Sequence, residues 1–354
     1  MRLDVPFIPD PDYARFLRTL GDQLGSVHFS LHSPQVADAR NVMEPHEAGA
    51  IIAALGELPG VDRYLLVNAR IQDPERYFDQ AHLFRTVEIL NRFRTEANLT
   101  GIVFADAYYL NALSRTAPEV CRSLQAVPSV NCMIDSAHQA FAYLRLVEQT
   151  AFAPPARLVL DRSLNRDPSR LAEVTATIRT RRLGLRLLLL ANEGCLSHCP
   201  YKPAHDAHLA LVRMPGCSDR TFAMNRELGC LATLQDEPWR LFSSPFIRPE
   251  DGHRFTSLVD GLKVCGRERG GRVYLERAVT AYAQGAYTGN LLSIMDTLGE
   301  FEDRWDIPNH ELPPDFHDRV TGCHGDCSTC PICRDLGSHV HTKEFRLPTY
   351  QAGK

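Results

Sequence analysis

Residues 157–195 read RLVLDRSLNRDPSRLAEVTATIRTRRLGLRLLLLANEGC and contain two apolar runs around an amphipathic stretch. The runs at 157–163 and 185–195 have the length of buried strands. The stretch between them has apolar residues at helical spacing, and Asp167 or Ser169 can cap its start. A strand, a helix and a second strand in this order predict a parallel unit whose sheet is covered by helices on both faces.

The same alternation extends along the chain in both directions. It yields eight strand-like segments, at 26–32, 62–69, 101–106, 129–135, 157–163, 185–195, 239–251 and 261–267. Six have a clear helix after them, including the stretches at 44–58, 78–97 and 273–287 and one that Ser136 can cap. Residues 1–25 are expected to form a lead-in helix. Eight such units over roughly 260 residues predict a (β/α)8 TIM-like barrel, with an open doubly wound sheet as the alternative.

The composition restricts the classes of function. The chain has 354 residues, 44% hydrophobic and 23% charged, with a net charge of −4. This balance argues against bulk nucleic acid as a partner. Neither a G-x-G-x-x-G turn after the first strand nor a P-loop occurs, so no nucleotide held in those ways is expected. The N-terminus MRLDVPFIPDPDY has no signal segment and no run approaches about 18 apolar residues. We therefore expect a cytoplasmic protein without a membrane span.

The chain contains 11 cysteines, none before Cys121 and nine at or after Cys195. A chain of this length can bury its own core, so a disulfide scaffold is not expected. In a reducing compartment, clustered cysteines are more often metal ligands or catalytic groups. Cys121 and Cys132 stand alone in apolar or strand-like contexts and are predicted to be core residues.

The C-terminal part differs in character from the rest. We expect a barrel over 1–304 and a small Cys-rich, metal-binding segment over 305–354, because the latter has few apolar residues and many Cys and His. Its cysteines are spaced Cys323-x3-Cys327-x2-Cys330-x2-Cys333. Successive short gaps favour an iron–sulfur cluster, and a structural zinc site is the alternative, since zinc more commonly uses two separated pairs.

A second pair of cysteines, Cys195 and Cys199, follows directly on the apolar run LRLLLLA. In a barrel, the carboxyl ends of the strands carry the chemistry. Thiols four residues apart can reach one metal centre, and candidates for the remaining ligands are Cys217, Cys230 and Cys265. The radical-SAM pattern Cys-x3-Cys-x2-Cys is absent, because Lys202 stands at the third position.

Four further side chains are candidates for catalysis. His205 and His208 follow the cysteine pair and are predicted to transfer protons, the alternative being solvated surface residues. Arg248 and Arg267 end strand-like segments and are predicted to bind a carboxylate or phosphate, the alternative being structural salt bridges. No Gly-x-Ser-x-Gly or His-Glu-x-x-His motif of a hydrolase is present.

Several motifs, taken in order, resemble the collagenase-like peptidase family U-32. They are LQAVPSVNCMIDSAHQAFAYL with RLVLDRSLN, then NEGCLSHCP, SPFIRPED, and LKVCGRERGGRVYLERAVTAYAQGAYTGN, together covering roughly 26–290. The last contains Lys263-Val264-Cys265-Gly266-Arg267, which is similar to the family's Lys-aliphatic-x-Gly-Arg segment. Two features depart from the broad family pattern: the close Cys-x3-Cys spacing, which is nearer to the ubiquinone-type branch, and the Cys-rich tail.

The resemblance implies a TIM-like barrel with a [4Fe-4S] cluster at its mouth. It implies a ligand role for Cys195 and Cys199, with Cys230 as the third ligand. Members of the family include oxygen-independent hydroxylases of RNA bases or ubiquinone precursors, which take their oxygen from prephenate. We therefore expect an iron–sulfur oxidoreductase that hydroxylates a small molecule or a peptide. A U-32-type peptidase and a non-catalytic iron–sulfur subunit that acts with a partner protein are the alternatives.

Overall fold

The centre of the fold is a sheet of eight parallel strands. The computed structural model describes residues 1–31, 33, 35, 36, 38, 39, 46–212, 214, 217–266, 271–323 and 325–343. The strands are β1 (Arg2–Pro6), β2 (Leu24–Phe29), β3 (Asp62–Val67), β4 (Gly101–Phe104), β5 (Gln125–Pro128), β6 (Arg157–Leu160), β7 (Arg186–Leu190) and β8 (Gly261–Lys263). Their order is β5-β4-β3-β2-β1-β8-β7-β6, which confirms the predicted (β/α)8 TIM-like barrel.

The barrel closes between β5 and β6 at an isolated bridge. The bridge joins Gln125 to Ala153, which lies four residues before β6 begins. The backbone N–H of Ala126 donates to the carbonyl of Ala153 at 3.2 Å, and the N–H of Ala153 donates to the carbonyl of Leu124 at 2.9 Å. The sheet is therefore nearly closed, with its weakest seam between these two strands.

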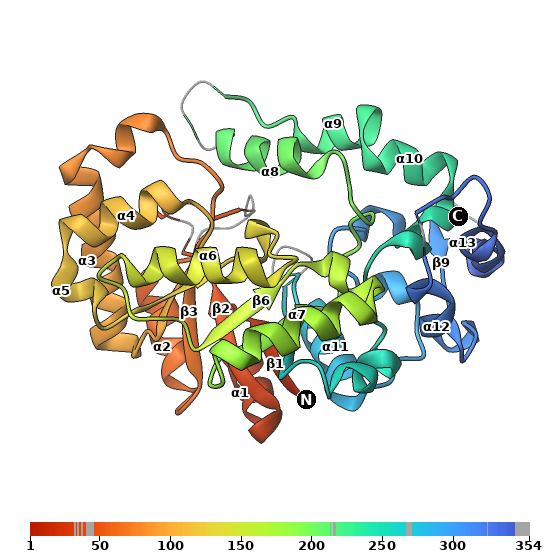
Figure 1. Cartoon of the computed structure of the whole chain (residues 1–354), viewed down its shortest axis with the longest axis horizontal. Helices are drawn as coiled ribbons and strands as arrows, with labels where there is room; N and C mark the ends of the chain where they lie inside the picture. Colours follow the sequence, from red (N-terminus) through yellow and green to blue (C-terminus); the bar gives the residue numbers. More distant parts are fainter. Residues whose placement is uncertain are drawn as a thin grey trace, which may run out of the picture.

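Helices cover the outer face of the sheet (Figure 1). They are α1 (Pro11–Arg18), α2 (Ala48–Gly56), α3 (Gln80–Ala97), α4 (Ala107–Thr116), α5 (Pro118–Cys121), α6 (Ala137–Glu148), α7 (Pro168–Arg181) and α11 (Gly271–Gln284). Two predicted caps are confirmed, because Ser136 accepts the N–H of Gln139 and Asp167 accepts the N–H of Arg170. Three more helices, α8 (Lys202–Leu211), α9 (Thr221–Leu228) and α10 (Cys230–Asp236), lie across one end of the barrel.

The first strand, β1, corrects the prediction that residues 1–25 form only a lead-in helix. Leu3 and Val5 belong to the large core cluster with the helices, whereas Asp4 contacts side chains of β2, β6 and β8 across the barrel interior. A charged residue at the centre of a five-residue strand breaks the apolar run on which the prediction depended. The helical part of the prediction is confirmed by α1.

Two predicted strands are wrong. Residues 239–251 form 3-10 turns at Pro238–Ser243 and Pro249–Phe255, since prolines at 238, 245 and 249 cannot donate to a sheet. Residues 129–135 follow β5 and contain a 3-10 turn at Val130–Cys132, where Ser129 accepts the N–H of Asn131. The expected total of eight strands holds only because two strands outside the predicted segments, β1 and β5, replace the segments at 239–251 and 129–135.

The C-terminal residues pack beside the barrel (Figure 1). They include β9 (Trp305–Asp306), paired antiparallel with β10 (His341–Thr342), and the short helices α12 (Phe316–Thr321) and α13 (Ile332–Leu336). The ring of Phe316 lies against Phe242 and Phe246, with centroid separations of 6.1 and 5.7 Å. The predicted division at 304/305 stays a prediction.

A glycine at the start of β4 allows two strands to approach closely. A Cβ at Gly101 would lie 2.8 Å from the Cβ of Gln125 on β5, and it would also overlap the carbonyl oxygen of Gln125. We expect Gly101→Ala to lower the free energy of unfolding by about 1–3 kcal/mol, because the strands must separate or strain. Denaturant unfolding measures this, with Gly49→Ala as the control, since a Cβ at Gly49 meets nothing within 4 Å. Equal stability of the two variants would contradict the predicted overlap.

Candidate functional site

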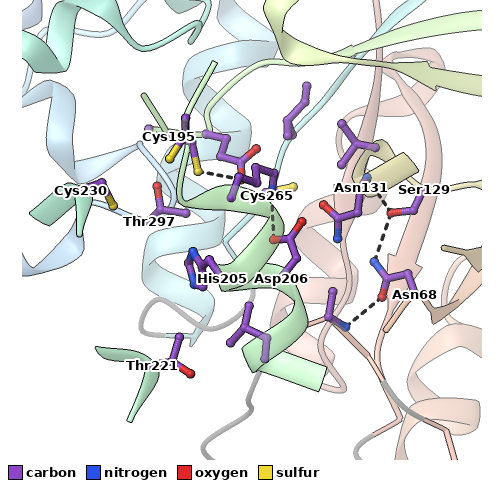
Figure 2. Close-up of a pocket in the computed structure, with 18 of the residues that line it drawn as sticks. Asn68, Ser129, Asn131, Cys195, His205, Asp206, Thr221, Cys230, Cys265 and Thr297 are labelled. Carbon is purple, nitrogen blue, oxygen red and sulfur yellow. Dashed lines mark hydrogen bonds and ion pairs between the residues drawn. The ribbon is translucent and has the colours of Figure 1, made fainter. Parts of the chain in front are cut away.

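A cavity of about 400 Å³ lies at the carboxyl ends of the strands, under α8, α9 and α10. Its wall includes residues just beyond the strand ends: Asn68 and Ser129 directly follow β3 and β5, and Glu193 lies three residues beyond β7. Figure 2 shows Cys195, Cys230 and Thr297 on one side and Asn68, Ser129 and Asn131 on the other. This volume is typical of a small-molecule pocket.

Four thiols from three separate segments line this cavity. Cys195 and Cys199 lie in the loop after β7, Cys230 begins α10, and Cys265 lies two residues beyond the end of β8. Cys217, the other candidate ligand, is exposed and is not among the residues that line the cavity. The fold therefore brings together the three predicted cluster ligands and Cys265.

Cys199 and Cys230 interact directly. The Cys230 thiol donates a hydrogen bond to Cys199, and together with the backbone N–H groups of Tyr201 and Lys202 it lowers the pKa of Cys199. The same hydrogen bond and burial raise the pKa of Cys230, and the charge on Cys195 raises it further. This hydrogen bond therefore favours the thiolate form at Cys199 rather than at Cys230, and the thiolate is the form that binds metals.

The Asn192 side chain joins the loop after β7 to two other segments by hydrogen bonds. The side chain donates from Nδ2 to the carbonyls of Cys265 (2.9 Å) and Ile294 (3.0 Å), and Oδ1 accepts the N–H of Cys265 (2.7 Å). Asn192 therefore fixes the loops after β7 and β8 relative to each other. Glu193 forms a buried ion pair with Arg162 and accepts a hydrogen bond from the Cys195 thiol at 3.3 Å.

The structure places the two predicted histidines differently. His205 lines the cavity, and its Nε2 lies 3.4 Å from Nδ2 of Asn225. His208, one turn further along α8, does not line it. Two polar residues of α8 also reach the cavity: Lys202, whose pKa is lowered by burial, pairs with Asp206 at 2.9 Å.

The structure describes one of the two predicted arginines, Arg248. Arg248 is buried beside its own turn, with Nε 3.5 Å from a Glu250 carboxylate oxygen and 3.7 Å from one of Asp251. It does not line the cavity, and this geometry agrees with the structural alternative. Arg267 lies outside the described residues, and its predicted role stays a prediction.

Sequence reasoning missed the charged floor of the cavity. Asp4 Oδ2 lies 2.8 Å from Lys263 Nζ, and Asp4 Oδ1 lies 2.8 Å from Arg157 Nη1 and 3.2 Å from His28 Nδ1. Burial acts to raise the pKa of Asp4, but Arg157, Lys263 and His28 together lower it well below its ordinary value. Each of β1, β2, β6 and β8 provides one of these side chains from a position that faces the barrel interior. The only sign of them in the sequence is a single charged residue within or beside an apolar run.

The tail cysteines form a second group beside the barrel. Burial raises the pKa of Cys333 to about 11; Arg166 opposes this, and the charges on Cys323, Cys327 and Cys330 add to it. The four thiols are thus close enough to influence one another. Arg166 is itself buried and donates to the carbonyl of Ser244.

The two remaining cysteines, Cys121 and Cys132, lie in the core. Cys121 and Cys132 are buried, the first at 0% and the second at 8% exposure, as expected of core residues.

Among the described residues, no three Cys, His, Asp or Glu side chains are gathered tightly enough for a single metal ion. Within the same residues, no helix combines the length and the apolar character needed to cross a membrane.

Comparison with known proteins identifies one related sequence. No protein-family model matches the chain. It is 26% identical over 241 residues to an "uncharacterized protease" of Methanocaldococcus jannaschii. The match covers 67% of this chain and 64% of that protein, so this chain spans less than two thirds of its relative's length.

Two solved structures have a similar arrangement of elements. The U32 peptidase Mk0906 is matched over 74% of this chain and 91% of its own, with 14% identity and a TM-score of 0.46. Endonuclease IV from Thermus thermophilus is matched over 81% of this chain and 100% of its own, with 12% identity and a TM-score of 0.38. At such scores the likenesses carry no argument about function.

Proposed function

Since its motifs and its curated relative support membership of the collagenase-like peptidase family U-32, we propose that this chain is an iron–sulfur oxidoreductase. Its cavity would hold a [4Fe-4S] cluster, and its reaction would be an oxygen-independent hydroxylation of a small molecule or a peptide. The observation that carries the proposal is the meeting of four thiols in one cavity.

The donor set fits such a cluster. Iron–sulfur clusters are held by cysteine thiolates, commonly four, and soft ligands of this kind select them over hard cations. Cys195, Cys199 and Cys230 would be ligands, and Cys265 takes precedence over Cys217 as the fourth because it alone of the two lines the cavity. The cluster, when bound, would supply one-electron redox chemistry. A cluster also spaces its ligands more widely than one ion does, in keeping with the absence of a tight single-ion group among the described residues.

The residues around the thiols have separate tasks in this proposal. Helices α8, α9 and α10 cover the cavity and limit the access of water to it. His205 is the candidate for moving a proton, because it lines the cavity and its pair with Asn225 orients the ring. Glu193 is held by Arg162 and accepts a hydrogen bond from the Cys195 thiol, so it would be the first acceptor of the proton that Cys195 releases on becoming a ligand.

The tail would carry a second metal centre. Cys323, Cys327, Cys330 and Cys333 lie in one short segment and influence one another electrostatically. An iron–sulfur cluster is favoured by the short spacings, with zinc as the alternative. A cluster there would relay electrons or stabilise the segment.

A peptidase is the second candidate, because the curated relative is named a protease. The feature that favours it is Cys199, whose pKa is lowered and which shares the cavity with His205. A cysteine peptidase needs such an activated thiol and a base within hydrogen-bond reach. A non-catalytic subunit remains the third reading, and it would show activity only with a partner protein.

Metal analysis of anaerobically prepared protein tests the proposal. We expect a coloured protein with about four irons per chain for one cluster or about eight for two. Electron paramagnetic resonance after reduction should then give a cluster signal. A colourless protein with one zinc and no iron would contradict the iron–sulfur reading. Cleavage of peptides that persists after iron is chelated would favour the peptidase.

A further inference from the structure

Arg166 is a buried arginine without a carboxylate partner among the described residues. It ends the 3-10 turn Arg162–Arg166, is 8% exposed, and donates to the carbonyls of Ser244 at 3.0 Å and Phe242 at 3.3 Å. No carboxylate oxygen of the described residues lies within 4 Å of its guanidinium nitrogens. A buried charge is expensive unless an opposite charge compensates it, so an anion from another group is expected beside Arg166.

Other buried arginines of the barrel have such compensation. Arg157 and Arg248 each lie within 4 Å of a carboxylate oxygen. Arg63 donates to carbonyls near the ends of α2 and α3, and each helix end carries about half a negative charge. Arg166 reaches the end of only one short 3-10 turn, Pro238–Ser243, so a large part of its charge is left for another anion to balance.

Two cysteines of the tail are the strongest sources of negative charge around Arg166. Burial lowers the pKa of Arg166 to about 10, and the charges of Cys333, Cys323 and Asp251 oppose this, in that order. Asp251 already lies within 4 Å of two other arginines. The thiols are therefore the candidates for the missing anion, because a thiol that binds a metal does so as the thiolate.

The packing of the tail places its thiols on this side of the barrel. Helix α12 packs against the turn that contains Arg166, and α13, which contains Cys333, packs against the turn Pro238–Ser243. The guanidinium carbon of Arg166 lies 5.9 Å from the centre of the Phe316 ring on α12. Cys333 itself packs against the core. Arg166 is thus held by two backbone carbonyls of the barrel at the surface where the tail docks.

We propose that Arg166 is the positive charge that balances a metal–thiolate centre of Cys323, Cys327, Cys330 and Cys333, and that loading this centre holds the tail on the barrel. Four thiolates outweigh the charge of one Zn²⁺ ion or of an iron–sulfur core, so the centre is net negative in either case. Arg166 acts through this charge as a positioning residue and not as a ligand. The inference rests on the tail centre of the proposed function and adds the barrel residue on which that centre depends.

The reduction potential of an iron–sulfur centre in the tail tests the charge. It is measured in the anaerobically purified full chain carrying Cys195→Ala, which removes the signal of the cavity cluster. Arg166→Gln keeps an amide donor but loses the charge that favours the added electron. At a fixed potential its tail centre should therefore be about tenfold less reduced, a shift of about 59 mV for one electron. Arg166→Lys, which keeps the charge, should restore most of the shift. An unchanged potential in folded Arg166→Gln would overturn the proposal.

Metal retention tests the same charge for zinc as well as for iron. A chelator should remove the tail metal about tenfold faster from Arg166→Gln than from the wild type, and Arg166→Lys should lie close to the wild type. The control is Arg179→Gln, which removes a partly exposed arginine paired with Asp260 and should retain the metal like the wild type. Equal retention in Arg166→Gln and Arg179→Gln would overturn the proposal.

Hydrogen exchange tests the docking without any change at Arg166, so it decides even if Arg166→Gln does not fold. Residues 238–243 pack against α13 and should become exposed when the tail leaves. We expect their amides to exchange about tenfold faster in Cys330→Ala, which lacks a tail ligand, than in the wild type. Cys217→Ala should exchange like the wild type. Equal exchange in Cys330→Ala and Cys217→Ala would contradict docking by the metal.

Metal analysis of the same preparations separates this inference from the proposed function. Zinc in the tail whose retention depends on Arg166, in a chain without iron, would support the inference and sink the oxidoreductase. Iron in the cavity together with a tail that holds no metal would overturn the inference and keep the oxidoreductase.

Discussion

Anaerobically prepared Cys195→Ala protein should lose most of the iron held at the cavity, and with it the turnover, while the barrel stays folded. Cys195 lies in a loop outside the helices and strands, is only partly buried, and donates a hydrogen bond from its thiol to Glu193. Its removal therefore costs a ligand but little packing. Iron content, visible absorbance and far-ultraviolet circular dichroism measure the two effects on one sample.

Cys217→Ala is the matched control, because Cys217 is exposed and lies away from the cavity. It should keep both iron and activity. Cys330→Ala should lose only metal held in the tail. If Cys195→Ala retains its full iron content and turnover, the assignment of the site is wrong.

Asp4→Ala should destabilise the barrel more than any other single change considered. It would leave the Arg157 and Lys263 charges buried without their shared partner, a change that costs about 3–5 kcal/mol. Denaturant unfolding measures the loss, with Asp12→Ala as a control in the same chain segment; Asp12 pairs with Arg272 at the surface, where pairs contribute little. The double variant Asp4→Asn with Lys263→Met should recover part of the loss. Equal stability of Asp4→Ala and Asp12→Ala would contradict this account.

The pH dependence of that loss has a definite sign. The pKa of Asp4 is lowered in the folded protein, so its stabilising contribution is fully present above the ordinary carboxyl value of about 3.9. It is lost as the pH falls through the lowered folded pKa. The difference in unfolding free energy between wild type and Asp4→Ala should therefore be constant near neutrality and shrink in acid.

The fold was predictable from the sequence to the extent that its strands are apolar. β6, β7 and the helix α7 between them were recognised from residues 157–195, because their apolar residues repeat at strand and helix periods. β1 was missed because Asp4 interrupts it. The segment at 239–251 was wrongly assigned because its apolar residues suggest a strand, although its prolines leave it too few donors for a sheet.

The candidate site was predictable only where its residues are adjacent in sequence. Cys195 and Cys199 were found from their spacing after a strand. The resemblance to the U-32 family pointed to Cys230, and Cys265 was only one of several candidates. Of the candidate catalytic residues, His205 lies at the cavity, whereas His208 and Arg248 do not line it.

By itself, the sequence determined the alternating architecture, the crowding of thiols after β7 and in the tail, and the expectation of metal chemistry, because these depend on periodicity and on local spacing. Only the tertiary structure decided which of Cys217 and Cys265 shares a cavity with the pair, and it alone joined Asp4, Arg157 and Lys263. Those three residues are separated by more than a hundred positions along the chain. Closing the barrel brings them within hydrogen-bond distance, since inward-facing positions of strands remote in sequence meet at its axis.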